Sequence, residues 1–437
     1  MDSESLFIYS KSDQRKIITL EKLAIIGTGI AGMGCAHLLQ NKFDLTIFEQ
    51  NNYVGGHTNT ISVDEDGKPV YIDTGFMVFN YETYPNLCNL FEKIKAPVKK
   101  TDMSFSVQHV PSGLEYCGSG LNGLFAQRKN IFNIRYIKML QQISRFNKEA
   151  IKIIDDPSYE KYSLKKFIDE FNFGEDMLWK YLVPMGSAVW STPMELMLDF
   201  PAKTLIRFFK NHGFLGFNTQ HQWYTLENGS QSYREILIKP FKEKIQISNA
   251  VIKVRRENNK AIVQTKNGET HQFDKIIFAC HADQALNILD NPANIELRLL
   301  SNFKYQKNIA TVHTDESVMP KNKKAWSSWN YLVEEKNERL VPTTIYWMNS
   351  LQHVSKKKNY FVSINALPGS INKDKFIMGI EYEHPLFDIA AVEAQKELCK
   401  LNQQGVSYYC GSYFKYGFHE DAYASAVELC RILNNTN

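Results

Sequence analysis

The stretch LAIIGTGIAGMGCAHLLQNKFDLTIFE, residues 23–49, decides the fold that this sequence predicts. Its apolar run at 23–26 is typical of a strand buried in a parallel sheet. Residues 33–40 then predict a helix, and residues 43–49 predict a second strand that ends in an acid. Between the first strand and the helix lies GTGIAG, the GxGxxG pattern of a dinucleotide-binding βαβ unit. A chance glycine-rich turn would not bring all of these parts together in this order.

Each part of this unit has a physical task in holding a dinucleotide. Gly27 permits the tight turn, and Gly29 lets a pyrophosphate approach the backbone. Gly32 allows close contact between helix and strand. The helix N-terminus, with Ile30 and Ala31, offers free N–H groups to the phosphates. We therefore expect these five residues to bind a cofactor.

The acid at the end of the second strand predicts how the adenosine is held. Glu49 stands 22 residues after Gly27, where a carboxylate would accept hydrogen bonds from the ribose hydroxyls. Gln50 beside it is a further candidate for cofactor binding. A carboxylate here disfavours a 2′-phosphate, and hence NADP.

A second glycine pair follows in VGGHTNT, residues 54–60. By itself the pair is also compatible with a plain hairpin turn. Together with Glu49, however, GGHTNT resembles the GG-doublet motif of FAD enzymes related to amine oxidases and phytoene desaturases. The resemblance implies a turn that extends the cradle of the longer cofactor, FAD, and it implies cofactor contacts by Gly55, Gly56, His57, Thr58 and Thr60. His57 stands where arginine is usual, so we expect its charge near the pyrophosphate to depend on pH.

Three further segments resemble the same superfamily. PVYIDTGFMVFN, residues 69–80, is similar to the segment that passes the flavin, and residues 250–280 are similar to its β-meander and the next parallel strand. Residues 408–433 predict a strand, a loop and a terminal helix with Asp421 as N-cap. In such families the N-terminus of that helix faces the flavin, where its dipole stabilises negative charge. The resemblance implies cofactor contacts by Thr74, Gly75, Phe76, Val251, Gly411, Ser412, Glu420, Asp421 and Ala422.

A narrower resemblance covers nearly the whole chain from Leu23. TGFMVFNYETYPNLCNLF, DMSFSV, LEYCGSGLNGLFAQR and GFHED are together similar to a group of predicted FAD-dependent oxidoreductases. Genes of that group often lie beside those of cyclopropane-fatty-acid synthases and similar lipid methyltransferases. The resemblance implies a lipid or other apolar substrate and a lipid methyltransferase as partner. The chain departs from the group at Ala422, where glycine is usual.

The predicted architecture is α/β, with a glutathione-reductase-like FAD-binding Rossmann domain and an inserted mixed α+β substrate domain. We assign residues 1–105, 225–299 and 395–437 to the FAD-binding domain. Residues 106–224 and 300–394 form the substrate domain. Two aromatic-rich stretches, 325–333 and 343–349, predict strands that either wall an apolar tunnel or fill a core.

Apolar residues at three- and four-residue steps predict a long amphipathic helix between residues 134 and 153. Its other face carries five basic residues against Glu149 alone. We favour a solvated basic face over contact with an anionic membrane.

Catalytic motifs of other enzyme classes and metal-ligand clusters are missing from the sequence, which is typical of flavin chemistry. His419 is the best acid/base candidate, although a lone histidine is more often structural. The prediction is hydride transfer between the flavin and an acyl chain, giving desaturation or double-bond isomerisation. One alternative is an amine oxidase with an aromatic cage that includes Tyr413 and Tyr416. The other is a non-catalytic FAD-binding partner of a lipid methyltransferase.

Composition sets the remaining bounds. A net charge of +4 is too small to indicate nucleic-acid binding. Seven scattered cysteines without a CxxC pair indicate reduced thiols. The first twenty residues contain no apolar run of the kind found in signal peptides. We expect a cytoplasmic protein, with peripheral contact at the inner face of the membrane as the alternative.

Overall fold

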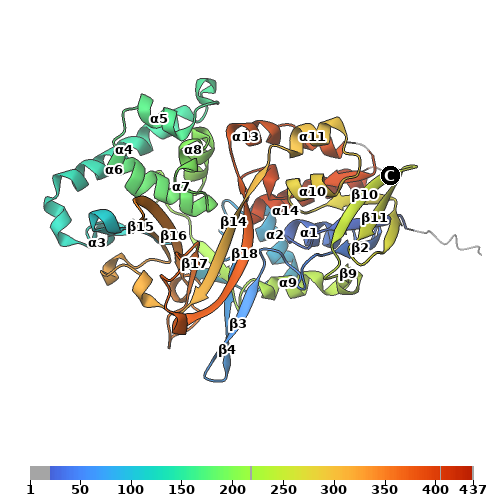
Figure 1. Cartoon of the computed structure of the whole chain (residues 1–437), viewed down its shortest axis with the longest axis horizontal. Coiled ribbons are helices and arrows are strands. Elements are labelled where there is room, and N and C mark those ends of the chain that lie inside the picture. Colours follow the sequence, from blue (N-terminus) through green and yellow to red (C-terminus); the bar gives the residue numbers. More distant parts are fainter. Residues whose placement is uncertain (1–19, 217–218, 404, 436–437) are drawn as a thin grey trace, which may run out of the picture.

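The computed structural model describes residues 20–216, 219–403 and 405–435, so the segment examined for a signal peptide lies almost wholly outside the described residues. Figure 1 shows a cofactor-type α/β part at the right and helices α3–α8 gathered at the left. The first part is built on a parallel sheet in the order β19-β13-β1-β2-β9. Its strands are β1 (Lys22–Ile26), β2 (Asp44–Phe48), β9 (Ile245–Gln246), β13 (Lys275–Phe278) and β19 (Ser407–Tyr409). The predicted Rossmann-type sheet is confirmed.

The predicted βαβ unit forms because its apolar residues are buried on both sides of the sheet. Leu23, Ala24 and Ile25 of β1 are fully buried. Helix α1 (Ile30–Leu39) connects β1 to β2 and packs against the terminal helix α14 (His419–Asn435). The meander is also as predicted, with antiparallel strands β10 (Val251–Glu257), β11 (Lys260–Thr265) and β12 (Thr270–Phe273).

The second part is built on a seven-stranded sheet in the order β18-β14-β17-β16-β15-β6-β7. All of its neighbouring strands are antiparallel except β15 and β6. Its strands are β6 (Phe105–His109), β7 (Leu114–Cys117), β14 (Lys304–His313), β15 (Trp329–Lys336), β16 (Arg339–Trp347), β17 (Phe361–Ile364) and β18 (Phe376–Leu386). The sheet therefore combines two segments that lie far apart in the chain.

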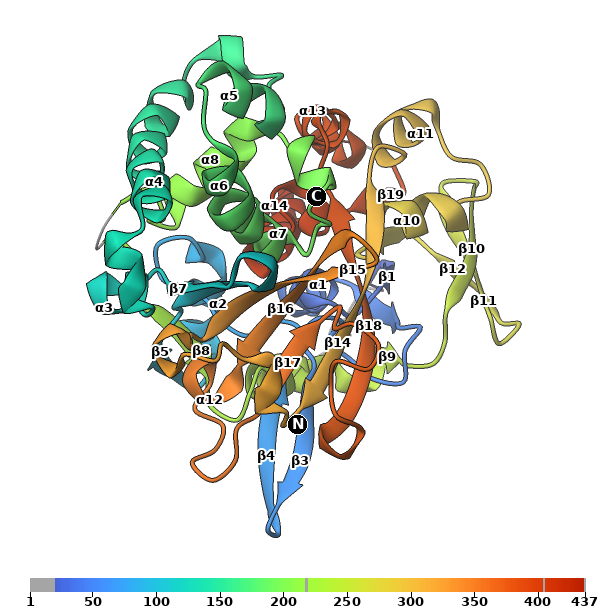
Figure 2. The same ribbon diagram turned by 60° about the vertical axis from the view of Figure 1, so that its left-hand side comes forward.

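Helices cover one side of this sheet near β15 and β7 (Figure 2). They are α3 (Gly120–Leu124), α4 (Ile134–Ile153), α5 (Leu164–Glu170), α6 (Glu175–Met177), α7 (Val183–Trp190) and α8 (Ala202–Asn211). The predicted long helix is confirmed as α4, whose Phe146 and Ala150 are fully buried in the core.

The remaining strands and α-helices complete the two parts. They are the hairpin β3 (Thr60–Glu65) and β4 (Lys68–Asp73), the pair β5 (Val98–Thr101) and β8 (Trp223–Leu226), and helices α2 (Pro85–Ile94), α9 (Gln231–Ile238), α10 (Ala282–Ile288), α11 (Asn294–Leu300), α12 (Met348–Leu351) and α13 (Ile389–Gln395). Among the described residues, none of the helices is both long and apolar enough to cross a membrane.

Several predicted boundaries are wrong. The helix predicted at 33–40 begins at Ile30, and the strand predicted at 343–349 begins at Arg339 and ends at Trp347. The stretch 325–333 is a strand only from Trp329, because the Asn330 side chain accepts a hydrogen bond from the Ser327 N–H at 3.0 Å and turns the chain before the strand. The terminal helix begins at His419, so Asp421 lies in its first turn rather than at the N-cap. The Asp421 carboxylate instead reaches back to accept from the Phe418 N–H at 2.9 Å.

Candidate functional site

One cavity of about 810 Å³ lies between the parallel sheet and the second part of the molecule. Residues predicted from every cofactor segment of the sequence line it, although those segments are spread over almost 400 residues. They are Gly27, Gly29, Ile30, Ala31, Glu49, Gln50, Gly56, His57, Thr74, Gly75, Phe76, Val251, Gly411, Ser412, His419 and Ala422. The structure thus assembles one extended cradle.

The second glycine pair lies directly against the first glycine loop. Gly56 adopts a positive φ of 58°, and a Cβ atom on it would lie 3.3 Å from the Gly29 Cα. A Cβ atom on Gly29 itself would meet no atom within 4 Å, so it would project into open space at the cavity wall. A cradle of bare backbone that leaves this space free fits a pyrophosphate held by main-chain N–H groups.

The acid of the βαβ unit is held by a residue that the sequence analysis missed. The Thr28 N–H and hydroxyl donate to Glu49 Oε2 at 3.0 and 2.5 Å, and the Asn51 N–H donates to Oε1. The Gly55 N–H in turn donates to the Thr28 hydroxyl at 3.2 Å. Thr28 therefore joins the first glycine loop, the acid and the second glycine pair, and Glu49 keeps lone pairs for a ribose.

Two predicted glycines do not line the cavity. The Gly55 N–H donates to the Thr28 hydroxyl, and Gly55 is not among the residues that line the cavity. Gly32 faces its own loop, because a Cβ atom there would lie 1.9 Å from the Gly27 carbonyl oxygen. Gly32 thus allows the close approach of helix and turn that its place in the motif requires.

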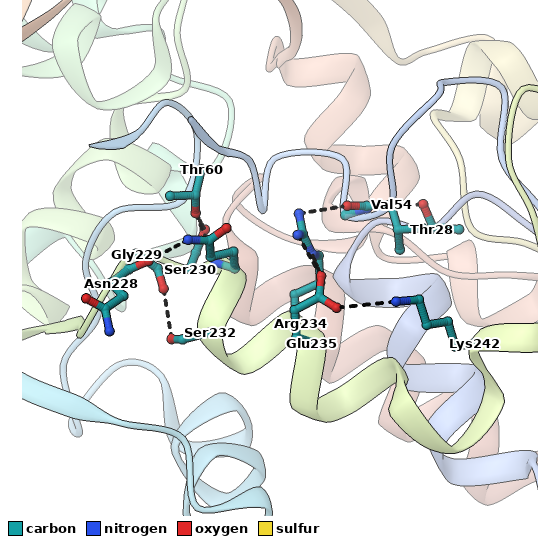
Figure 3. A network of polar contacts seen from close by, with 12 residues as sticks. Thr28, Val54, Thr60, Asn228, Gly229, Ser230, Ser232, Arg234, Glu235 and Lys242 are labelled. Carbon is teal, nitrogen blue, oxygen red and sulfur yellow. Dashed lines mark hydrogen bonds and ion pairs between the residues drawn. The ribbon is translucent and has the colours of Figure 1, made fainter. Parts of the chain in front are cut away.

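The hydroxyls of Thr58 and Thr60 are also turned away from the cavity. Thr58 Oγ1 lies 2.5 Å from the Tyr233 hydroxyl, and Thr60 Oγ1 donates to Asp73 Oδ1 at 2.5 Å. Asp73 is fully buried and needs such donors, which it also receives from Ser230. Figure 3 shows Thr60 beside Ser230. The predicted contact between Thr60 and the cofactor is therefore replaced by a bond to a buried carboxylate.

Arg234 of helix α9 holds the outer side of the same turn. Its Nη1 donates to the Val54 carbonyl at 3.2 Å, and its Nη2 pairs with Glu235 at 2.8 Å (Figure 3). Arg234 does not line the cavity, so it supports the turn rather than taking the place of the arginine that is missing at position 57.

His57 lies in a relay of hydrogen bonds whose direction is fixed by the backbone. The Ile309 N–H donates to Asn365 Oδ1 at 2.9 Å, and Asn365 Nδ2 donates to Asn308 Oδ1 at 2.7 Å. Asn308 Nδ2 then donates to His384 Nδ1 at 2.7 Å. A neutral His384 must therefore carry its proton on Nε2, which lies 3.2 Å from His57 Nε2.

This relay corrects the expected charge of His57. Burial and the neighbouring His384 hold the pKa of His57 well below its usual value, and burial lowers the pKa of His384 to about 4. Both rings are neutral at neutral pH, so His57 accepts on Nε2 and carries its proton on Nδ1. The ring lines the cavity and stacks on Tyr382 with centroids 4.8 Å apart. His57 therefore offers a neutral N–H donor in place of a positive charge.

His419 stands at the start of α14 on the cavity wall. Its Nε2 lies 2.7 Å from the Tyr233 hydroxyl, and its ring stacks on Phe76 with centroids 3.9 Å apart. Burial lowers the pKa of His419 to about 3, so the ring is neutral. A histidine whose Nε2 is already bonded, and whose ring is fixed on an aromatic neighbour, suits positioning of the helix start better than proton transfer.

The neutral state of His419 predicts a dependence of stability on pH. Between about pH 3 and pH 6.5 the unfolded chain binds a proton at this site that the folded chain does not bind, so stability falls as the pH falls through this window. Replacing His419 with glutamine, which keeps a polar partner for Tyr233, should reduce the loss of unfolding free energy between about pH 7 and about pH 5 by up to about 2 kcal/mol. Denaturant unfolding of both proteins at the two pH values measures this loss of unfolding free energy. An equal loss in both proteins would contradict the neutral assignment.

Glu420 is turned away from the cavity and binds the start of another helix. Its carboxylate accepts from the Leu87 N–H at 2.9 Å and from the Asn86 N–H and Nδ2 at 3.1 and 2.7 Å. These donors lie in the first turn of α2, which otherwise has no side-chain cap. Glu420 therefore holds the start of α2, and Asp421 holds the start of α14. Neither carboxylate lines the cavity.

Replacing Glu420 with glutamine should lower stability and leave FAD affinity unchanged. The amide can satisfy only part of the donors at α2, so we expect a loss of about 1–3 kcal/mol in unfolding free energy. Glu428→Gln is the matched control, since Glu428 is an exposed acid on the same helix. Thermal unfolding and FAD titration of both variants test this, and a selective loss of FAD binding in Glu420→Gln would return Glu420 to the cofactor site.

The far end of the cavity is apolar. Its lining from α7, α8, α12, β8, β15, β16 and β17 and from the segment after α8 consists mainly of aliphatic and aromatic side chains, among them Val189, Trp190, Phe208, Phe214, Trp223, Trp329, Tyr346, Leu351 and Ile364. The predicted aromatic strands thus contribute to both alternatives: Trp329 and Tyr346 line the cavity, and Tyr331 is buried in the core. We call the nine lining residues from Val189 to Ile364 named above the apolar end.

The acidic residues that line the cavity come from other elements. They are Glu49, held by Thr28, and Glu381 and Glu383 on β18. Glu383 lies 3.5 Å from His281. In the described chain, none of the cavity-lining residues from α7, α8, β8, β15, β16 or β17 is acidic.

Tyr413 and Tyr416, the two residues named for an aromatic cage, both line the cavity. Tyr413 packs on Phe303 and Phe414, with ring centroids 5.2 and 5.0 Å apart. Tyr416 contributes its carbonyl, which accepts from Trp190 Nε1 at 3.0 Å.

Comparisons with known proteins agree with this geometry. The family model described as flavin containing amine oxidoreductase matches residues 30–354. No curated protein sequence matches the chain. Similar solved structures include wild-type putrescine oxidase bound to putrescine, with a TM-score of 0.67, 12% identity and coverage of 95% of this chain and 99% of that one.

Two further structures are equally similar. A CLA-producing fatty acid isomerase from P. acnes has a TM-score of 0.66 and 13% identity, with 95% of this chain and 99% of that chain covered. Cyclohexylamine oxidase from Brevibacterium oxydans IH-35A has a TM-score of 0.66 and 12% identity, with 95% and 100% covered.

Proposed function

The chain belongs to the flavin-containing amine oxidoreductases and is an FAD-dependent oxidoreductase, and from that premise we propose that its substrate is a lipid. The reaction would be hydride transfer between the flavin and an unsaturated or methylated acyl chain. In desaturation the chain would lose a hydride to the flavin and a proton to solvent, so the flavin would end reduced. In isomerisation the hydride would return to a different carbon of the chain, which shifts the double bond.

The observation that carries this proposal is the apolar end of the cavity. A protonated amine that enters a buried site needs a carboxylate or an aromatic cage, because an unpaired charge loses its hydration there. The apolar end contributes no acidic lining residue, and the acids Glu381 and Glu383 line the cavity from β18 instead. Tyr413 lines the cavity and packs on Phe303. A hydrocarbon chain gains free energy from the same surroundings, on the order of 0.8 kcal/mol for each buried CH₂ group.

Fold similarity does not choose between the substrates. Putrescine oxidase, cyclohexylamine oxidase and the fatty acid isomerase match this chain with nearly equal TM-scores. Amine oxidation is therefore the second candidate, and the family match favours it. We choose the lipid over the amine as substrate because of the charge of the residues that line the cavity.

The residues around the cavity have separable tasks in this proposal. When bound, FAD supplies the acceptor for a hydride. The glycine loops and Thr28 hold the dinucleotide end, and the His57 N–H and the start of α14 provide donors along the cradle. The apolar end excludes water and orients the chain. His419 fixes the helix start through Tyr233.

Product analysis tests the proposal. FAD-loaded protein is incubated with phospholipids that carry monounsaturated or methylated acyl chains, and the fatty acids are then released and analysed for new or shifted double bonds. We expect such products only from active protein. Unchanged lipids, together with peroxide and aldehyde from a panel of amines, would replace the proposal with amine oxidation.

The partner implied by the narrower resemblance, a lipid methyltransferase, stays a prediction. A methylated acyl chain made by such an enzyme would fit the apolar end as well as an unsaturated one. Co-purification of the two proteins tests the association.

A further inference from the structure

Large apolar side chains protrude at one end of the group of helices α3–α8, where the chain runs from α3 into α4. Phe132 is 88% exposed, Leu121 75% and Ile134 72%, and Ile131 beside them is 47% exposed. We call these four residues the tip patch. An isolated exposed apolar residue is ordinary, but four from 14 consecutive positions form a concentrated surface.

The tip patch is held in place by ordered structure beneath it. The Tyr136 hydroxyl donates to the Leu124 carbonyl at 2.7 Å, and Tyr136 is itself buried. Arg128 Nη2 donates to Asn122 Oδ1 at 3.0 Å, and Asn133 caps α4 by accepting from the Tyr136 N–H. The apolar side chains therefore project from a fixed platform.

The charge around the tip patch is mainly positive, with Asp176 paired to Arg135 as an acidic neighbour. From residue 116 to residue 148 the chain contains no acidic residue and six basic ones, which are Arg128, Lys129, Arg135, Lys138, Arg145 and Lys148. The loop beside α3 adds exposed Lys323 and Lys324, which Asn322 joins to the tip through the Ala126 carbonyl. An apolar centre with a basic rim is the pattern of a surface that enters an anionic interface.

The two arginines of the basic face of α4 make contacts within the molecule. Arg135 pairs with Asp176, and Arg145 donates to the carbonyls of Phe171 and Asn172. These two arginines are therefore committed to contacts within the molecule. Lys129 and Lys138 are exposed beside the tip patch.

We propose that the tip patch docks on the surface of a lipid bilayer that carries anionic headgroups. Phe132, Ile134 and Leu121 would enter the boundary between headgroups and acyl chains, and the basic rim would contact the headgroups. The helices stay outside the bilayer core. A second copy of this chain is disfavoured as the occupant, because two tips brought together would oppose surfaces of like charge.

The position of the tip suits such contact. Figures 1 and 2 both show α3 and the start of α4 at the edge of the molecule. Helix α3 contacts β7, and β18 is the opposite edge strand of the seven-stranded sheet. The parallel cofactor sheet therefore stays on the far side. The proposal does not rest on the lipid as substrate, since docking requires only a bilayer surface.

A pair of matched double variants tests the proposal with the FAD-loaded protein. Phe132→Ser with Ile134→Ser removes the centre of the tip patch. Phe376→Ser with Met378→Ser removes side chains that are 52% and 44% exposed on β18, the opposite edge strand of the same sheet. Both changes lie on the surface, so thermal unfolding and flavin content should match the wild type.

Co-sedimentation with vesicles gives the readout. Wild type and the Phe376/Met378 variant should bind vesicles that contain phosphatidylglycerol, and binding to pure phosphatidylcholine should be weaker. The Phe132/Ile134 variant should lose at least about tenfold in partition onto the anionic vesicles. No binding by the wild type, or equal binding by both variants, would overturn the proposal. So would a wild-type dimer in light scattering that only the Phe132/Ile134 variant dissociates.

Discussion

Replacing Gly29 with alanine should deprive the protein of FAD while leaving it folded. Gly29 has a φ of −59°, which alanine adopts without strain, and a Cβ atom there meets no atom within 4 Å. The polypeptide alone can therefore accommodate the methyl group. The same group would stand where a pyrophosphate approaches the backbone, so we expect FAD affinity to fall on the order of 100-fold, or about 2.7 kcal/mol.

The measurement compares flavin content after gel filtration with thermal unfolding of the cofactor-free protein. Gly379→Ala is the matched control, because a Cβ atom at this strand position makes only ordinary contacts at 3.9 Å. The control should keep both FAD and stability. If Gly29→Ala retains FAD at wild-type affinity, the cradle does not hold the pyrophosphate at this loop.

Filling the apolar end should abolish turnover of an acyl substrate and spare the cofactor. Val189 lies on α7 and lines the cavity, so a tryptophan there would occupy volume that the proposal assigns to the hydrocarbon chain. We expect Val189→Trp to lower kcat/KM for the lipid by at least about 100-fold, which corresponds to about 2.7 kcal/mol of transition-state stabilisation. FAD content should stay at the wild-type level.

Ile252→Trp controls for the added bulk, because Ile252 is an exposed residue of β10 and does not line the cavity. Steady-state kinetics on both variants give the comparison. Undiminished lipid turnover by Val189→Trp would remove the apolar end from the substrate path.

The cofactor cradle could be predicted because its signals are local. Gly27 and Gly29 lie between β1 and α1, Gly32 lies in the first turn of α1, and the glycine pair at 55 and 56 follows within a few residues of Glu49. Such spacing fixes backbone geometry directly. The residues from this stretch that line the cavity are therefore mostly those that were expected.

What sequence spacing cannot show is which polar partner a side chain chooses. Thr60 bonds to Asp73, and Glu420 bonds to the start of α2, because buried carboxylates and helix ends both require partners. Both partners come from elements that only the fold brings close. The direction of these side chains follows from satisfaction of buried groups rather than from the motif.

The neutral state of His57 is a further consequence of distant packing. His384 and Tyr382 lie on β18, more than 320 residues from His57, and their alternate positions on a strand place both beside it. Period-2 alternation in the segment EYEH was the available signal. This alternation alone does not show that the strand lies beside the second glycine turn.

The most direct test of the account follows the visible absorbance of the bound flavin under anaerobic conditions, on rapid mixing with phospholipid vesicles or with a panel of mono- and diamines. The account predicts that the flavin bands fade with lipid, lastingly for desaturation and transiently for isomerisation, and stay constant with every amine. Fading with amines and constant absorbance with lipid would contradict it.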